Sequence, residues 1–172
     1  MNKKGFRNEF KYYINYFEYE ALRRRLAAVL KRDKFSNENG DYHIRSLYFE
    51  DINNTALFEK QAGVLSRKKY RIRIYNIEDN VIKLEKKSRI GQFINKESAS
   101  ITREEFDKII DNNISFLRDS SNKLLIEFYF DIMAYKYKPE VIVDYIREAY
   151  VWDTNNIRIT FDKYLKTKNN SI

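Results

Sequence analysis

The stretch RKKYRIRIY, residues 67–75, shows most clearly how the chain folds. Its polar and apolar residues alternate with a period of two, which predicts a β-strand whose two faces differ. One face is apolar and can enter a core, because it carries Tyr70, Ile72 and Ile74. The other face carries Lys69, Arg71, Arg73 and Tyr75. Like charges on neighbouring positions repel each other unless water or a polyanion neutralises them.

Three further stretches repeat this alternation: RNEFKYY at 7–13, VIKLEKK at 81–87 and IRITFD at 157–162. In VIKLEKK, for example, Lys83, Glu85 and Lys87 share the charged face. Strands of this kind that close into a barrel with their charged faces inward would form a basic channel, which suits a chain of phosphates. The alternative for any one of these strands, taken alone, is a solvated face of an antiparallel sheet.

Composition and charge limit the class of protein. The 172 residues fit a single domain, and 43% hydrophobic residues are enough for a core. The formal net charge of +8 predicts an anionic partner, such as a nucleotide, polyphosphate, nucleic acid or an acidic membrane surface. Without cysteine, the chain has no disulfide, thiolate metal site or cysteine nucleophile.

Several common sites are excluded by the sequence. The four glycines form neither GxxxxGK nor GxGxxG, so side chains must bind any phosphate. The single histidine supports neither a catalytic triad nor a metal cluster. No stretch has the roughly 18 apolar residues of a membrane span, and the start of the chain lacks a signal-peptide core. We therefore expect a cytoplasmic location.

The order of elements predicts an α+β fold with an antiparallel sheet curved into a tunnel and flanking helices. Strands are expected at 7–13, 42–50, 68–76, 80–87, 92–101 and 157–163, with a further β-rich run at 139–152. Helices are expected at 17–31, 53–62, 102–111 and 122–135. The stretch LLIEFYF within 122–135 also fits a strand, but its apolar spacing over the longer span favours a helix.

Two carboxylates lie on the charged faces of the expected strands. Glu9 and Glu85 could each offer one oxygen to Mg²⁺ or Mn²⁺ while phosphates fill the remaining positions. The alternative is that each pairs with a neighbouring cation. Glu85 is flanked by Lys83 and Lys87, which favours such pairing.

Six segments in order resemble the VTC domain, the polyphosphate polymerase domain of the triphosphate tunnel metalloenzyme superfamily. They are FRNEFKYYI, YHIRSLYFED, KYRIRIYN, IKLEKKSR with Lys96 beyond it, VDYIREAYV and RITFD. The resemblance implies an antiparallel tunnel of about eight strands with helices packed around it. It also implies ATP as phosphate donor, a divalent metal, usually Mn²⁺, and polyphosphate held inside the tunnel.

The resemblance assigns roles to individual residues. It implies phosphate binding by Lys11, Arg71, Arg73, Lys87, Lys96, Arg147 and Arg158, with Arg45 as an addition. Among these, Lys11, Arg71, Arg73 and Lys87 are the expected catalytic cations. Lys69 and Lys83 join the phosphate-binding set because they share the charged faces of their strands.

The chain also departs from the family pattern. Arg7 stands where the first-strand motif has its other Glu, which weakens a metal role for that strand. The sequence stops after DKYLKTKNNSI, before the family's LEVK-like strand with its metal-binding Glu. We therefore expect a VTC-like domain over 1–165, a polar tail over 166–172, an open barrel edge and an incomplete metal site.

The predicted function is binding of ATP and polyphosphate or triphosphate in a basic tunnel, with transfer of the ATP γ-phosphate to a polyphosphate chain. The alternative is a non-catalytic module that binds a polyanion, either polyphosphate or RNA, since stacking and phosphate contact use the same residue types. Between these anions we expect phosphate chains rather than nucleic acid.

Overall fold

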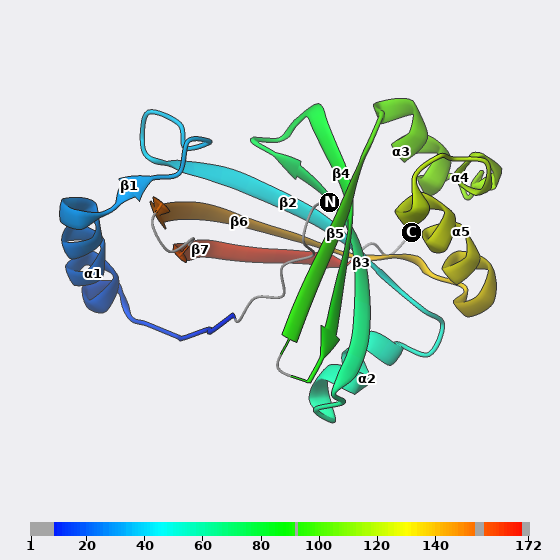
Figure 1. Cartoon of the computed structure of the whole chain (residues 1–172), viewed down its shortest axis with the longest axis horizontal. Coiled ribbons are helices and arrows are strands. Elements are labelled where there is room, and N and C mark those ends of the chain that lie inside the picture. The colour runs from blue at the N-terminus through cyan, green and yellow to red at the C-terminus, as the bar shows by residue number, and fades with distance from the viewer. Residues whose placement is uncertain (1–8, 92, 154–156, 170–172) are drawn as a thin grey trace.

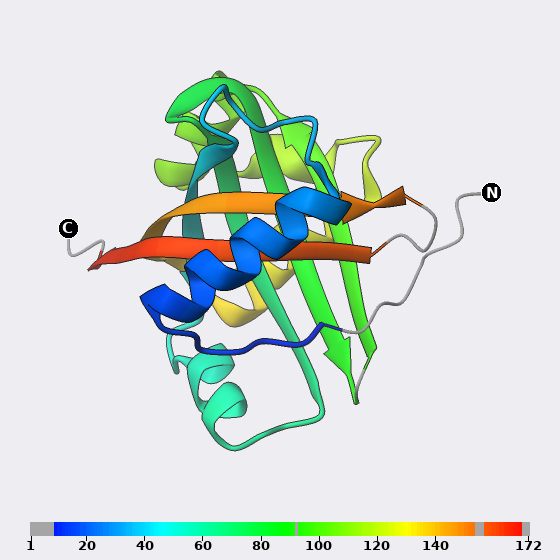
Figure 2. The same ribbon diagram turned by 90° about the vertical axis from the view of Figure 1, so that its left-hand side faces the viewer.

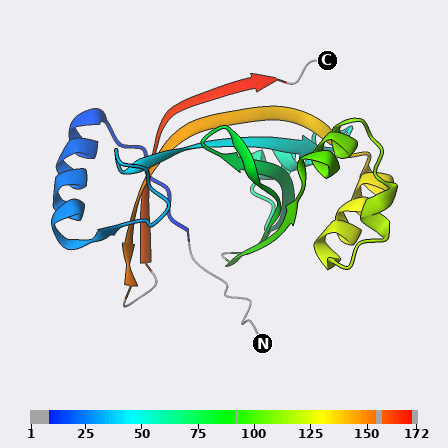
Figure 3. The same cartoon turned by 90° about the horizontal axis from the view of Figure 1, so that it is seen from above.

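A single curled antiparallel sheet organises the molecule. The computed structural model describes residues 9–91, 93–153 and 157–169. The strands are β1 (Lys31–Arg32), β2 (Asp41–Glu50), β3 (Ser66–Tyr75), β4 (Glu78–Ile90), β5 (Phe93–Ile101), β6 (Lys138–Trp152) and β7 (Ile157–Asn169). Their order is β1-β6-β2-β3-β4-β5, with β7 on the free side of β6. The sheet bends into a half-barrel with a concave and a convex side (Figures 1 and 3).

The helices lie on the convex side and at the ends of the sheet. They are α1 (Tyr16–Val29), α2 (Thr55–Gln61), α3 (Arg103–Ile110), α4 (Ser115–Arg118) and α5 (Lys123–Tyr135). The α+β class and the four expected helices are confirmed, including the helix in the ambiguous stretch, whereas α4 was not predicted. Among the described helices, none is both long and apolar enough to cross a membrane.

The main core lies between the convex face of the sheet and the helices α3–α5. Tyr70 and Ile72 of β3 are buried there beside Phe128 of α5, as the alternation predicted. The Tyr70 hydroxyl donates a 2.6 Å hydrogen bond to Asp131, so its polar end is satisfied inside the core. Because this face of β3 is buried, its arginines must point to the concave side.

Helix α1 crosses the convex side of β6 and β7 at the other end of the sheet (Figure 2). It begins with a capping box in which Asn15 and Glu18 bond each other's backbone amides. None of its residues is buried, and even its apolar side chains Leu22 and Val29 are exposed. Polar contacts to Glu148 therefore hold α1 more than apolar packing does.

The first expected strand is wrong for the residues that the structure describes. Residues 9–15 form no strand, although RNEFKYY alternates, and residues 7 and 8 lie outside the described residues. A strand needs a partner for its backbone amides, and no sheet edge pairs with residues 9–15. At the other end, β7 continues past its expected end at 163, so residues 166–169 belong to the sheet.

Candidate phosphate-binding face

A row of three lysines crosses the concave side of the sheet. Lys69 of β3 stands opposite Lys87 of β4, which stands opposite Lys96 of β5. Like charges directly opposite each other on adjacent strands repel. Burial lowers the pKa of all three side chains, because removal of water penalises the charged ammonium. This row is therefore a place where an anionic ligand would relieve both repulsion and desolvation.

A row of mixed charge lies next to the lysines. Arg71 stands opposite Glu85, and its Nε and Nη2 lie 2.8 Å and 2.6 Å from Oε2 of that carboxylate. Lys96 pairs with the other oxygen, Oε1. Arg71 also donates a 2.9 Å hydrogen bond to the Tyr48 hydroxyl. Burial is the largest single effect on the pKa of Tyr48 and raises it, but the charge and hydrogen bond of Arg71 together with the charges of Arg73 and Lys11 outweigh burial, so the pKa falls.

Arg73 lies one row further along and is the most enclosed of these cations. Only 4% of its surface is exposed. Its Nε donates to Ser46 Oγ at 3.1 Å and its Nη2 to the Tyr145 hydroxyl at 3.0 Å. These bonds fix the guanidinium, so Arg73 would act on a ligand mainly through its charge. Lys83 stands opposite Arg73 on β4 and shares this face.

Two further arginines extend the concave face onto β6 and β7, and both are paired. Arg147 forms a bidentate pair with Asp162, with both N–O distances at 2.7 Å. Burial lowers the pKa of Arg147, but the hydrogen bond and charge of Asp162 together with Tyr145 and Tyr42 outweigh burial and raise it. Arg158 donates to the Tyr42 hydroxyl at 2.6 Å and lies 2.5 Å from an oxygen of Asp33.

The segment before α1 reaches the same face from the inner side of the bend (Figure 3). Glu9 pairs with Lys87, the middle lysine of the row. The charge of Lys11 contributes to lowering the pKa of both Tyr48 and Lys87, after the larger effects of burial and closer partners. Lys11 therefore adds to the positive field of the concave face although it belongs to no strand.

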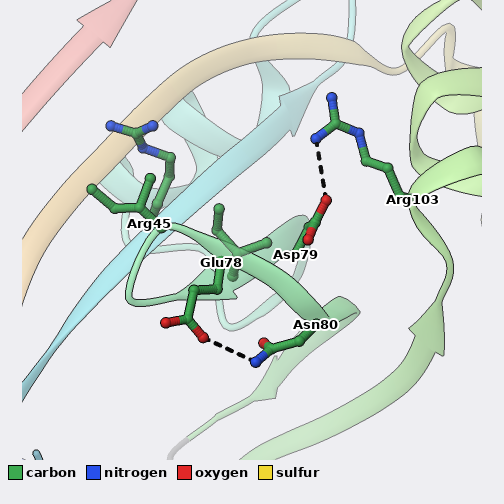
Figure 4. A pocket seen from close by; sticks show the side chains of 7 residues that line it. Arg45, Glu78, Asp79, Asn80 and Arg103 are labelled. Carbon is green, nitrogen blue, oxygen red and sulfur yellow. Dashed lines mark hydrogen bonds and ion pairs between the residues drawn. The ribbon is translucent and has the colours of Figure 1, made fainter.

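Arg45 lies on the opposite side of the sheet from the other cations. It forms a bidentate pair with Asp144, with both N–O distances at 2.9 Å. Together with Arg103 it lines an open hollow of about 580 Å³ beside the β3–β4 turn (Figure 4). Arg103 is 3.7 Å from Asp79 in that hollow, so both arginines are matched by carboxylates.

Sequence reasoning missed the residues that position the arginines. Tyr48, Ser46 and Tyr145 hold Arg71 and Arg73, while Asp162 holds Arg147. The signal for Ser46 and Tyr48 was their alternation within YHIRSLYFE, but only the register of β2 against β3 shows which arginine each one meets. The pairing of Arg147 with Asp162 likewise depends on the register of β6 and β7.

Neither Glu9 nor Glu85 belongs to a larger cluster of metal-ligating side chains among the described residues. Residues 9–91, 93–153 and 157–169 contain no group of three or more His, Cys, Asp or Glu placed to hold one. Glu9 is paired with Lys87, and both oxygens of Glu85 are paired with cations. Glu85 does not use its sequence neighbours Lys83 and Lys87 for this; its partners come from β3 and β5.

Comparisons with known proteins agree with this fold. No curated protein sequence matches the chain. A solved structure, of a protein from Bacillus halodurans assigned as an adenylate cyclase, matches with a TM-score of 0.58 and 10% sequence identity. The match covers 92% of this chain and 77% of that one, and at this identity it shows the fold alone. The family model for the VTC domain matches residues 6–171. The chain therefore belongs to the VTC domain family.

Proposed function

We propose that this domain binds inorganic polyphosphate and the triphosphate of ATP on the concave face of its sheet. The row formed by Lys69, Lys87 and Lys96 carries this proposal. Three opposed lysines with pKa values lowered by burial are unfavourable in the free protein. A chain of phosphates would bridge such a row, because its negative charges repeat along its length.

The proposed reaction is transfer of the ATP γ-phosphate to the end of a polyphosphate chain. A terminal oxygen of the chain attacks the γ-phosphorus, the bond from that phosphorus to the β–γ bridging oxygen breaks, and ADP leaves. Phosphoryl transfer depends mainly on positioning and on neutralising the transferring group. Arg71, Lys87 and Lys96 supply positive charge for both purposes, and Tyr48 holds the Arg71 guanidinium in place.

Metal dependence is a separate part of the proposal. The resemblance to tunnel enzymes implies Mn²⁺ or Mg²⁺, and the described residues contain no group of three or more His, Cys, Asp or Glu placed to hold either ion. No step of the proposed transfer is therefore assigned to a metal held by Glu9 or Glu85. Measuring each reaction with Mn²⁺, with Mg²⁺ and with EDTA would show what the ion contributes.

The activity is tested by incubating the protein with ATP and a short polyphosphate primer and separating the products on a gel. The proposed function predicts longer polyphosphate and an equal amount of ADP, both lost in Arg71→Ala. The variant Arg24→Ala is a suitable control, since Arg24 is exposed on α1. Absence of both products, together with tight binding of tripolyphosphate, would restrict the function to binding.

RNA binding is the competing function, and a competition experiment separates the two. Exposed aromatic side chains before and within α1, such as Phe10, Tyr12 and Phe17, offer surfaces on which bases could stack. If the concave face is selective for phosphate chains, tripolyphosphate should displace single-stranded RNA at low concentration. If single-stranded RNA instead displaced bound tripolyphosphate at low concentration, RNA would be the favoured partner.

A further inference from the structure

Glu85 is a buried carboxylate in the middle of the concave face. Only 1% of its surface is exposed, and its neighbours across the strands are Arg71 and Ser98. Burial by itself would raise the pKa of this side chain, but the charges of Arg71, Arg73 and Lys96 outweigh burial and lower it. The carboxylate is thus ionised and belongs to a cluster with more positive than negative groups.

Both oxygens of Glu85 lie beside cations, although Oε1 accepts no hydrogen bond of standard geometry. Oε2 accepts from Arg71, with Nη2 at 2.6 Å, and lies 3.9 Å from Arg73 Nη1. Oε1 is paired with Lys96. A divalent ion at this carboxylate would have to displace these partners and remain beside their positive charges, which Coulomb repulsion opposes.

We propose that Glu85 is an internal counter-ion rather than a metal ligand. It positions Arg71 and Lys96 in the free protein, and it competes with phosphate for their charges when a ligand arrives. The inference rests on the proposed phosphate binding and describes how affinity at that site is set. Glu85 therefore keeps the cation cluster ordered but lowers the affinity of the domain for phosphate. Removal of the Glu85 charge should tighten anion binding.

The variant Glu85→Gln tests this directly, because it keeps the shape and an oxygen acceptor while removing the charge. Titration calorimetry with tripolyphosphate in EDTA should give an affinity about tenfold tighter than that of the wild type. Without ligand, the variant should melt at a lower temperature, since Arg71, Arg73 and Lys96 lose their counter-ion. Tripolyphosphate should therefore raise its melting temperature by more than it raises that of the wild type.

The matched control is Glu148→Gln, the same substitution at a buried glutamate on the convex side of the sheet. It should leave the affinity for tripolyphosphate within about twofold of the wild-type value, because Glu148 faces away from the ligand. If the single variant Glu85→Gln does not fold, Glu85→Gln is combined with Lys96→Gln in a double variant. Lys96→Gln removes one buried positive charge and so compensates for the loss of the carboxylate charge. The double variant should then bind more tightly than Lys96→Gln.

The outcomes separate this inference from the proposed function. Equal or weaker binding by Glu85→Gln, with normal binding by the wild type, would overturn the counter-ion role alone. If Glu85 were a metal ligand, Glu85→Gln would bind tripolyphosphate in EDTA as tightly as the wild type does. Mn²⁺ would then tighten binding by the wild type but not by the variant. Failure of both proteins to bind tripolyphosphate would overturn the proposed function as well.

Discussion

Two buried glutamates lie on opposite faces of the same sheet, and each is surrounded by donors of a different kind. Glu148, on the convex side, accepts from the hydroxyls of Tyr19 and Tyr150, both at 2.7 Å, from Arg23 at 3.0 Å and from Lys163 at 3.3 Å. Glu85, on the concave side, has only cations as side-chain partners among the described residues. Both side chains are 1% exposed, so the difference is in their partners rather than in burial.

The comparison shows how one sheet separates structural charge from charge available to a ligand. At Glu148, neutral hydroxyls share the carboxylate with cations beneath α1, and the cluster joins a helix to two strands. At Glu85, one negative charge is shared by three cations, and the lysine row beside it adds further positive charge. Positive charge in excess on a concave surface concentrates anions there.

The largest expected effect is on stability, at Glu148. Glu148→Gln should lower the free energy of unfolding by about 3 kcal/mol, because Arg23 and Lys163 lose their counter-charge under α1. Urea denaturation followed by circular dichroism would measure it. A loss below about 0.5 kcal/mol would mean that the Glu148 cluster contributes little to folding.

Acid unfolding gives the same cluster a second test. Burial would raise the pKa of Glu148, but the bonds from Tyr19, Tyr150 and Arg23 outweigh burial and lower it to about 2. A carboxylate with a lowered pKa stabilises the fold above its unfolded-state value, roughly pH 4.3, and this contribution is lost as pH falls toward 2. The wild type should lose stability across this range, and Glu148→Gln should lose less.

The next largest effect is on binding, at Arg71. Arg71→Ala should weaken tripolyphosphate binding by about tenfold to a hundredfold, because it removes a charge-assisted contact of roughly 1.5–3 kcal/mol. We expect a loss of the same order for Arg73→Ala through its buried charge. Arg24→Ala should show only a small, salt-screened loss. Calorimetric titration of the three variants with tripolyphosphate at two salt concentrations would measure these losses of affinity. Equal losses in all three would mean that binding is diffuse surface electrostatics.

A smaller effect is expected from pH. Burial lowers the pKa of Lys69, Lys87 and Lys96 in the free protein, and bound phosphate would raise it again. Binding should therefore take up protons, and affinity should fall as pH rises toward the ordinary lysine pKa of about 10.4. Calorimetry in two buffers of different ionisation enthalpy would count the protons. Proton release on binding would contradict the lysine row as the site.

The smallest effect is expected at Arg45. Arg45→Ala should change tripolyphosphate affinity by less than about twofold, since the arginine is paired with Asp144 on the convex face. Fluorescence competition against a labelled polyphosphate would be sensitive enough to measure it. A tenfold loss would place phosphate on the convex side and remove the distinction between the two faces.

Much of the fold follows from local patterns in the sequence. Alternation in RKKYRIRIY placed Tyr70 and Ile72 in the core and Arg71 and Arg73 on the other face, as the structure confirms. Thr102 and Glu105 form the capping box that begins α3. The same alternation failed at residues 9–13, because a strand also needs a neighbour and the sequence does not say where one is.

The site could be predicted less completely than the fold. The alternation shows which residues share a face within one strand, but partners such as Tyr145 for Arg73 depend on register between strands distant in the sequence. Arg45 was difficult because YHIRSLYFE has apolar residues on both faces, so the sequence does not show which face is concave. The partners of Glu85 also lie on other strands rather than beside it in the chain.

The central claim is that phosphate binds the concave face and not the convex one. Titration of tripolyphosphate into ¹⁵N-labelled protein, followed through the arginine Nε–Hε signals, would test this directly. We predict that the signals of Arg71 and Arg147 shift with saturation, while those of Arg45 and Arg103 stay in place. Comparable shifts on both faces, or shifts confined to Arg45 and Arg103, would contradict the claim.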